Sequence, residues 1–461
     1  MSIKQGILRG GEKLPSVRHA RLAKQVSAST IFQAYYLLEA KGLIGAKERS
    51  GYYVTSTTPP FKQLPTPDTT IVMQSVQVDV SDLVFTILDT IKARNHIPLG
   101  SAFPSPLLFP LQKLAQHMAS TVKHTDPWVT VSDIGTGDTE LRRQIALRYH
   151  LDGVQTPLEH IIITNGALEG LNLCLAALTK PGDKVLIESP SFYASLQAIE
   201  RMGLQAVEVP CHPQHGIDLD ALEKAIIQHQ PQACWLMTNF QNPTGSLMSD
   251  ARKQRLVALM TQYQIPLIED DVYAELYYAD HRPKPAKAFD SEGWVLHCSS
   301  FSKCLAPGYR IGWVSAGRFA QAIARVKISS TLATSIPAQK AIAAYLAKGG
   351  YDKHLRALRH QLMMQQIQFS EAITQFFPHD IRLSLPNGGY FLWIKLPNNI
   401  SGLDVHQRAL AHHISIAPGS IFSASHHFKD YIRLNYGHAW TPDTEQALAT
   451  LGKIIQQLQP A

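Results

Sequence analysis

Short apolar runs alternate with segments of helical periodicity through the middle of the chain. The runs are residues 161–164, 184–188, 234–237, 265–268 and 294–296, and a helical stretch such as 168–178 follows the first. This alternation predicts an α/β fold with a mostly parallel central sheet covered on both faces. Polar residues gather where these runs end. Open sheets of this kind bind ligands at that edge, so we expect a site there.

The first 55 residues have a different pattern. A Pro-Ser cap signal opens a short helix that ends near residue 25, and a second helical period runs from Ser29 to Lys41 before Gly42. Two short apolar runs, 43–44 and 52–54, flank a basic tip at 47–51, which predicts a β-hairpin. Two helices followed by such a hairpin form a winged helix-turn-helix. Its second helix suits the major groove of DNA and its wing suits phosphate.

Charge supports a polyanionic partner for this segment. Residues 1–60 carry nine Lys and Arg against three Glu, a net +6, which leaves +1 of the total +7 for the rest of the chain. The stretch from Thr55 to about Thr70 is rich in Thr and Pro and has no apolar period, so it predicts a linker. We therefore expect a DNA-binding domain at 1–55, a linker at 56–78 and a large domain at 79–461. The large domain divides into a large subdomain, about 100–340, and a small C-terminal α/β subdomain, about 341–461.

Composition narrows the class of protein. The chain is 45% hydrophobic and 17% charged, no apolar run is long enough for a membrane span, and the first residues lack a secretion signal. Five scattered cysteines without metal-ligand spacing predict free thiols. We expect a cytoplasmic protein with no membrane partner and no metal site.

The N-terminal motifs resemble the DNA-binding domain of GntR-type bacterial regulators. The matching segments are LPSVR at 14–18, SAST at 27–30, AYYLLEAKGLI at 34–44 and RSGYYV at 49–54. That family opens with a full amphipathic helix before the LPS segment, and here the helix is expected to be shortened. The resemblance implies that the DNA contacts come from Ser16, Arg18, Ser27, Ser29, Thr30, Gln33, Lys47, Arg49, Ser50 and Gly51.

The run Ser299-Ser300-Phe301-Ser302-Lys303, with Arg310 close behind, carries the strongest chemical signal. A lysine amine forms a Schiff base with a carbonyl cofactor when its surroundings lower its pKa, and hydroxyls with a guanidinium suit a phosphate. Taken alone, this run is equally typical of a solvated loop. The glycine after 161–164 and the aromatic residue after 184–188 are also common in ordinary α/β proteins. The order of the motifs along the chain therefore has to decide between a cofactor site and ordinary loops.

That order resembles the fold-type I pyridoxal-phosphate (PLP) enzymes of the class I aminotransferase group. The resemblance covers about 76–461 and includes the run PNGGYFLW at 386–393. It implies that Lys303 carries PLP and moves the substrate α-proton, while Asp270 pairs with the pyridinium nitrogen. The implied binding set is completed by Asn242 and Tyr273 at the ring oxygen, Phe192 stacked on the ring, Gly166, Ala167, Leu168, Ser300, Ser302 and Arg310 at the phosphate, and Arg433 with the loop from Gly100 to Pro104 at a substrate carboxylate.

Together the two resemblances are similar to the MocR subfamily of transcriptional regulators. They imply a homodimeric, PLP-binding DNA regulator that senses PLP or an amino-acid adduct. The alternative is a working aminotransferase that acts on an α-amino acid and a 2-oxo acid. Many relatives carry a tyrosine within the span that corresponds to 125–137, from which it reaches the neighbouring subunit's phosphate, and this chain has none there.

Overall fold

The computed structural model describes residues 8, 11–40, 43–47, 51–54, 64–66, 74–91, 96–132, 134–383 and 385–459. Its helices are α1 (Val17–Lys24), α2 (Ala28–Ala40), α3 (Ser81–Ile91), α4 (Leu111–Val122), α5 (Val129–Ser132), α6 (Thr139–Leu151), α7 (Ala167–Leu178), α8 (Tyr193–Arg201), α9 (Leu219–His229), α10 (Asp250–Gln262), α11 (Ala320–Ser330), α12 (Ile336–Ala347), α13 (Gly350–Phe376), α14 (Gly402–Leu410) and α15 (Pro442–Gln457). Its strands are β1 (Ile44–Lys47), β2 (Gly51–Val54), β3 (Ser75–Gln77), β4 (Ile97–Pro98), β5 (Ile161–Thr164), β6 (Lys184–Ser189), β7 (Gln205–His212), β8 (Gly216–Ile217), β9 (Ala233–Leu236), β10 (Leu267–Asp270), β11 (Val295–Ser300), β12 (Gly312–Ser315), β13 (Arg382–Leu383), β14 (Phe391–Lys395), β15 (Ile414–Ser415), β16 (Ala417–Pro418) and β17 (Tyr431–Asn435).

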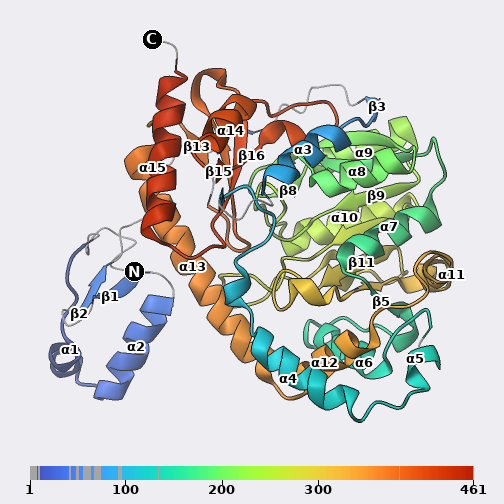
Figure 1. Cartoon of the computed structure of the whole chain (residues 1–461), viewed down its shortest axis with the longest axis horizontal. Coiled ribbons are helices and arrows are strands. Elements are labelled where there is room, and N and C mark those ends of the chain that lie inside the picture. The colour runs from blue at the N-terminus through green and yellow to red at the C-terminus, as the bar shows by residue number, and fades with distance from the viewer. Residues whose placement is uncertain are drawn as a thin grey trace.

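The N-terminal segment forms the predicted helices and hairpin (Figure 1). Strands β1 and β2 pair antiparallel, with Ile44 opposite Val54. Helices and hairpin share a small core of Leu14, Ala20, Ile31, Tyr35, Ile44 and Val54. The Tyr35 hydroxyl donates a 2.7 Å hydrogen bond to the carbonyl oxygen of Pro15, which ties α2 to the segment before α1. The winged helix-turn-helix expectation is confirmed, while the shortened first helix falls largely outside the described residues.

The large sheet has the strand order β3-β7-β6-β9-β10-β11-β12-β5, and β8 pairs with the outer part of β7. Strands β7, β6, β9, β10 and β11 run parallel, and β12 is antiparallel to both of its neighbours. Alternate residues of β6 enter opposite core layers: Val185 and Ile187 on one face, Leu186 with α9 and α10 on the other. The mostly parallel, doubly covered sheet is therefore confirmed.

Two strand boundaries differ from those expected from hydrophobicity. Strand β10 extends to Asp270 and β11 extends to Ser300, so both polar ends lie within the sheet. These polar residues belong to the strands because their backbones pair with the neighbouring strands. The hydrophobicity of the sequence does not reveal such pairing. Residues 75–77, assigned above to the linker, form β3 and pair with β7, because edge pairing needs only exposed backbone groups. The other domain boundaries stay predictions.

The C-terminal part forms a smaller sheet of order β13-β14-β17-β16, reached through the long helix α13 (Figure 1). Residue Trp393 of β14 lies opposite Arg433 of β17, which in turn lies opposite Ala417 of β16. Strand β4 pairs with β15, and the Asn435 amide N–H donates to the carbonyl oxygen of Leu99 at 2.7 Å. The segment that follows residue 97 is therefore fastened to the small sheet.

The remaining expectations from composition concern cysteines and membrane helices. All five cysteines are free and buried. Among the described residues, no helix has the length and apolar character that a bilayer crossing requires.

Candidate cofactor site and DNA-binding surface

The carboxyl ends of the parallel strands bring the predicted site residues to one edge of the sheet. Strand β5 leads to Gly166, β6 to Phe192, β10 ends in Asp270 and β11 leads to Lys303. Parallel strands end at the same edge, so residues more than a hundred positions apart in sequence meet there.

Lys303 follows β11 in a turn and is partly exposed. Its Nζ atom donates a 2.8 Å hydrogen bond to the carbonyl oxygen of Ala102 and lies 3.5 Å from the ring centroid of Phe103. Desolvation lowers the pKa of this amine to about 7. The positive charges of Arg433 and Arg310 also lower this pKa, whereas the negative charge of Asp270 raises it. A neutral fraction at physiological pH is what a nucleophilic amine requires.

Asp270 is 2% exposed, and its Oδ1 atom has no hydrogen-bond partner among the described residues. Burial and the neighbouring carboxylate of Asp271 raise the pKa of Asp270 to about 7, with Lys303 opposing. Asp271, in contrast, accepts hydrogen bonds from the Asn239 amide at 2.9 Å and pairs with His297 Nε2 at 2.9 Å. A buried carboxylate oxygen without a donor is costly unless a ligand supplies one, and a protonated ring nitrogen would do so. Asp270 therefore fits the cofactor.

The predicted phosphate residues form a cradle at the start of α7. Gly166 has φ +82°, and a Cβ atom there would collide with the guanidinium of Arg310. Arg310 donates to Ser302 Oγ at 3.2 Å and to the carbonyl oxygen of Asn165 at 3.1 Å. Ala167 and Leu168 form the first turn of α7, and Ser300 Oγ accepts from the Ser302 amide at 3.3 Å. A helix N-terminus, hydroxyls and a guanidinium together suit a phosphate group.

Asn242 and Tyr273 lie in contact with each other. The Asn242 Nδ2 atom is 3.4 Å from the Tyr273 hydroxyl, and both side chains are buried. Burial raises the pKa of Tyr273, so the hydroxyl stays protonated and can donate. Phe192 is partly buried and its ring packs on Tyr193 with centroids 4.6 Å apart. The structure thus brings Asn242 and Tyr273 together as expected, whereas the stacking role of Phe192 stays a prediction.

Arg433 is fully buried and lies against Gly100 and Asn242. Its guanidinium donates to the carbonyl oxygen of Gly100 at 2.6 Å and to Asn242 Oδ1 at 2.9 Å, while its Nε atom has no partner in the described part of the chain. Its Cζ atom lies 4.4 Å from the ring centroid of Phe391 and 5.3 Å from that of Phe422. Gly100 is required because a Cβ atom would lie 2.6 Å from the carbonyl carbon of Ile416. The predicted pair of Arg433 and Gly100 is therefore brought together.

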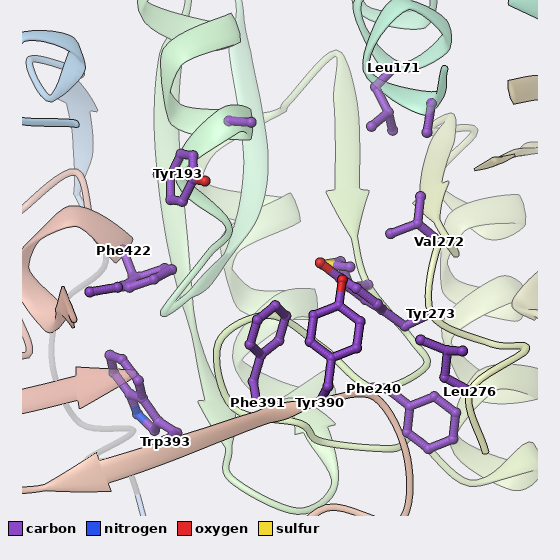
Figure 2. Packing of buried hydrophobic residues seen from close by; sticks show 14 of the residues in the cluster. Leu171, Tyr193, Phe240, Val272, Tyr273, Leu276, Tyr390, Phe391, Trp393 and Phe422 are labelled. Atoms are coloured by element: carbon purple, nitrogen blue, oxygen red, sulfur yellow. The ribbon is translucent and has the colours of Figure 1, made fainter. Parts of the chain in front are cut away.

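Two side chains near this pair, Tyr390 and Asn435, were not singled out from the sequence. The Tyr390 hydroxyl donates to the Ala102 carbonyl oxygen at 3.0 Å, the same acceptor that Lys303 uses. Asn435 Nδ2 donates to the carbonyl oxygens of Ser101 and Phe103, at 2.9 and 2.7 Å. Figure 2 shows Tyr390 beside Phe391 and Tyr273 in an aromatic cluster that extends to Phe422. Tyr390 lies inside the PNGGYFLW run, but sequence alone gives no sign that it meets residue 102.

Several of the predicted DNA-contacting residues lie on α1 and α2 and have exposed side chains. Arg18, Ser29, Thr30 and Gln33 are exposed. Ser16 Oγ accepts from the His19 amide and Ser27 Oγ from the Thr30 amide, so these two serines also cap helices. Lys47 ends β1 and Gly51 begins β2, while Arg49 and Ser50 lie outside the described residues.

These two parts define a class of protein, a helix-turn-helix unit joined to a fold-type I aminotransferase-like domain. Bacterial regulatory proteins of the gntR family match residues 1–54, and aminotransferases of class I and II match residues 111–451. The chain belongs to this combined family, the MocR-type transcriptional regulators, whose aminotransferase-like domain is of a PLP-dependent family.

Several relatives share the full length. An uncharacterized HTH-type transcriptional regulator, YdcR of Escherichia coli strain K12, is 44% identical over 99% of this chain and 97% of its own. A second from the same organism, YjiR, is 36% identical over 98% of this chain and 96% of its own. Among solved structures, the kynurenine aminotransferase of Pyrococcus horikoshii has a TM-score of 0.76 and 27% identity, and the likeness covers 82% of this chain and 95% of that one.

Proposed function

We propose that this protein is a DNA-binding transcriptional regulator that holds PLP at Lys303 and responds to PLP or to an amino-acid adduct of it. The observation that carries the proposal is the unpartnered, buried Oδ1 atom of Asp270 in a chain that also has an exposed winged helix-turn-helix surface. A buried carboxylate oxygen without a donor is costly, and a bound cationic ring nitrogen would supply the missing donor.

Each part of the site has a role in this proposal. Lys303 is the attachment group, and its lowered pKa leaves part of the amine neutral near pH 7. Asp270 holds a proton at the ring nitrogen, and Arg310 with the first turn of α7 holds the phosphate. When bound, PLP supplies an electron-accepting ring. Arg433 would exchange its bond to the Gly100 carbonyl for a bidentate pair with an amino-acid carboxylate.

The described part of the linker supports coupling between this site and the DNA-binding unit. Leu64 is 8% exposed and belongs to the main core of the aminotransferase-like domain. Pro65 lines a groove of about 320 Å³ with Arg382, Lys395 and other residues of the small subdomain. Strand β14, which ends in Lys395, pairs with β17, which carries Arg433. A ligand that shifts the small sheet would therefore act on the linker through direct contacts.

Homodimerisation is part of the proposal. Exposed apolar side chains gather near the phosphate cradle, on α5, α7, α11 and the segments beside them: Trp128, Ile134, Leu168, Ile328 and Leu332. A second copy of the chain would cover them. A regulator with this role works where the DNA is, so the proposal places the protein in the cytoplasm.

A second candidate, an active aminotransferase, is favoured by one specific observation. Lys303, Asp270 and Arg433, the residues that transamination needs, meet in one site, and the pKa values of Lys303 and Asp270 both lie near 7. Measured multiple turnover with an amino donor and a 2-oxo acid would favour this candidate.

The test uses the full-length protein. PLP is added, the visible absorbance is recorded, and borohydride reduction followed by peptide mapping locates the attached group, with Lys303→Ala as the control. Gel shifts on the DNA upstream of the gene are then measured over a salt series, with and without PLP. Labelling at Lys303 together with a sequence-specific complex supports the regulator. A protein that stays colourless, or that forms no specific complex, overturns it.

A further inference from the structure

An ion pair between the buried Lys327 and the partly buried Glu169, beside the phosphate cradle, has no role in the scheme above. Glu169 lies in the first turn of α7, and its carboxylate accepts a 3.3 Å bond from Lys327 Nζ of α11. The side chain of Lys327 is fully buried, and its amine also donates to Thr334 Oγ1 at 3.0 Å. Charged groups of this kind are seldom buried unless they hold a defined geometry.

The pair is connected to the cradle through Asn165. Glu169 accepts hydrogen bonds from both the backbone amide of Asn165 and its side-chain Nδ2, the latter at 3.1 Å. The carbonyl oxygen of Asn165 accepts from Arg310 Nη2 at 3.1 Å. The next residue is Gly166, which has no room for a Cβ atom because Arg310 lies over it. The turn Asn165–Gly166 is therefore held by two side chains: Glu169 accepts from the amide groups of Asn165, and Arg310 donates to its carbonyl oxygen.

The charge balance agrees with such a role. A carboxylate in the first turn of α7 repels an incoming phosphate unless a cation neutralises it. Lys327 supplies that cation, and Thr331 Oγ1 donates to the second carboxylate oxygen. Burial acts against ionisation, but the bonds from Thr331, Asn165 and Lys327 outweigh it and keep the pKa of Glu169 below its usual range. Glu169 thus stays ionised and paired while it orients Asn165.

We propose that Glu169 and Lys327 are positioning residues for the phosphate-binding turn Asn165–Gly166 and, through it, for Arg310. This inference rests on the proposed PLP function and adds to it a pair of residues outside the predicted ligand shell. It makes a specific claim: the pair contributes to the affinity for the phosphate of PLP and contributes nothing to the affinity for its ring and aldehyde.

The experiment compares two probes that differ only in the phosphate group. Dissociation constants for PLP and for pyridoxal are measured by absorbance titration on the full-length wild type, Glu169→Gln and Lys327→Met. We expect the substitutions to weaken PLP binding by about tenfold or more, within the range seen for residues that orient ligand-binding groups. Pyridoxal affinity should change less than about twofold. Lys340→Met, which breaks a 3.1 Å pair with Asp138, is the control, because neither residue is a predicted site residue.

Further measurements separate positioning from folding. The melting temperature of each variant is recorded, and Thr331→Val, which removes one hydrogen bond to Glu169, serves as a milder change if Lys327→Met does not fold. The double variant Glu169→Gln, Lys327→Met should cost no more PLP affinity than the worse single variant, since both disrupt one unit.

The outcomes are distinct. If the substitutions leave the ratio of the PLP and pyridoxal dissociation constants unchanged, the pair is merely structural. That result overturns the inference, while the proposed PLP function stands. A wild-type protein that binds neither probe overturns the proposed function itself.

Discussion

The amine of Lys303 and the carbonyl oxygen of Ala102, 201 positions apart in sequence, are joined by a hydrogen bond of 2.8 Å. The same segment also gives the Gly100 carbonyl to Arg433. Backbone carbonyls of this segment are therefore bonded to Lys303 and Arg433, the two cationic side chains that a cofactor and a carboxylate would use. Ligand binding has to exchange these internal bonds for bonds to the ligand.

Gly100→Ala should weaken both the fold and the ligand site. The new methyl group would lie 2.6 Å from the backbone of Ile416 and push the segment away from Arg433. We expect a loss of about 1–3 kcal/mol in the free energy of unfolding. Urea denaturation measures it, and the control is Gly308→Ala, because neither Gly100 nor Gly308 has positive φ and a Cβ atom at Gly308 meets nothing within 4 Å. Equal losses in the two variants would contradict the explanation.

The attachment of PLP to Lys303 should depend on pH near neutrality. Only the unprotonated amine reacts, and its pKa of about 7 lies far below the ordinary 10.5. The rate of borohydride-trapped labelling should rise about tenfold from pH 6 to pH 8 and then level off. Arg433→Gln removes a positive charge that lowers this pKa, so the inflection should move to higher pH. A rate that climbs steadily to pH 10 would contradict the lowered pKa.

Asp270→Asn should stabilise the cofactor-free protein above neutral pH. The folded pKa of about 7 exceeds the ordinary 3.8, so folding takes up a proton and the stability from this group falls as pH rises from about 4 to 7. Removing the charge should recover roughly 2–4 kcal/mol at pH 8. Melting curves at pH 5 and pH 8 measure it, and Asp404→Asn, an exposed site, is the control. The same variant should lose transamination half-reactions if the wild type has them.

Glu208→Ala should loosen the small subdomain. The Glu208 carboxylate on β7 accepts from the amides of Ala424 and Ser425, at 3.0 and 3.1 Å, and from two serine hydroxyls. Loss of the acceptor leaves these donors unsatisfied, so unfolding should become easier by about 2–3 kcal/mol. The loop adjoins Phe422, which packs near Arg433, so carboxylate binding should weaken as well. Glu208→Gln keeps one acceptor oxygen, so its stability should lie between those of the wild type and Glu208→Ala.

Arg18→Ala should weaken DNA binding and its dependence on salt. Arg18 is exposed on α1 and lies where a phosphate contact is expected. Loss of one such contact reduces the slope of log affinity against log salt by about 1. Arg408→Ala, on an exposed position of α14, should leave the slope unchanged. Equal slopes for Arg18→Ala and the wild type would place Arg18 outside the interface.

The sequence by itself determined many of the secondary-structure elements and the order of the candidate site residues along the chain. Periodicity located the two N-terminal helices, the wing and five strands of the large sheet, β5, β6, β9, β10 and β11, because residues that are buried must be apolar. The order of Gly166, Asp270 and Lys303 along the chain carried the resemblance that assigns their roles, and the alternation of strands and helices predicted that strand ends meet at one edge of the sheet.

Only the tertiary structure decided which of these groups face one another. Lys303, Arg433 and Tyr390 each donate to a backbone carbonyl of residue 100 or 102, and a carbonyl carries no signal in the sequence. The Glu169–Lys327 pair was likewise invisible, since 158 positions separate two residue types that are usually solvated. Local pattern reports burial and turns, whereas pairing across long separations is set by how the layers pack.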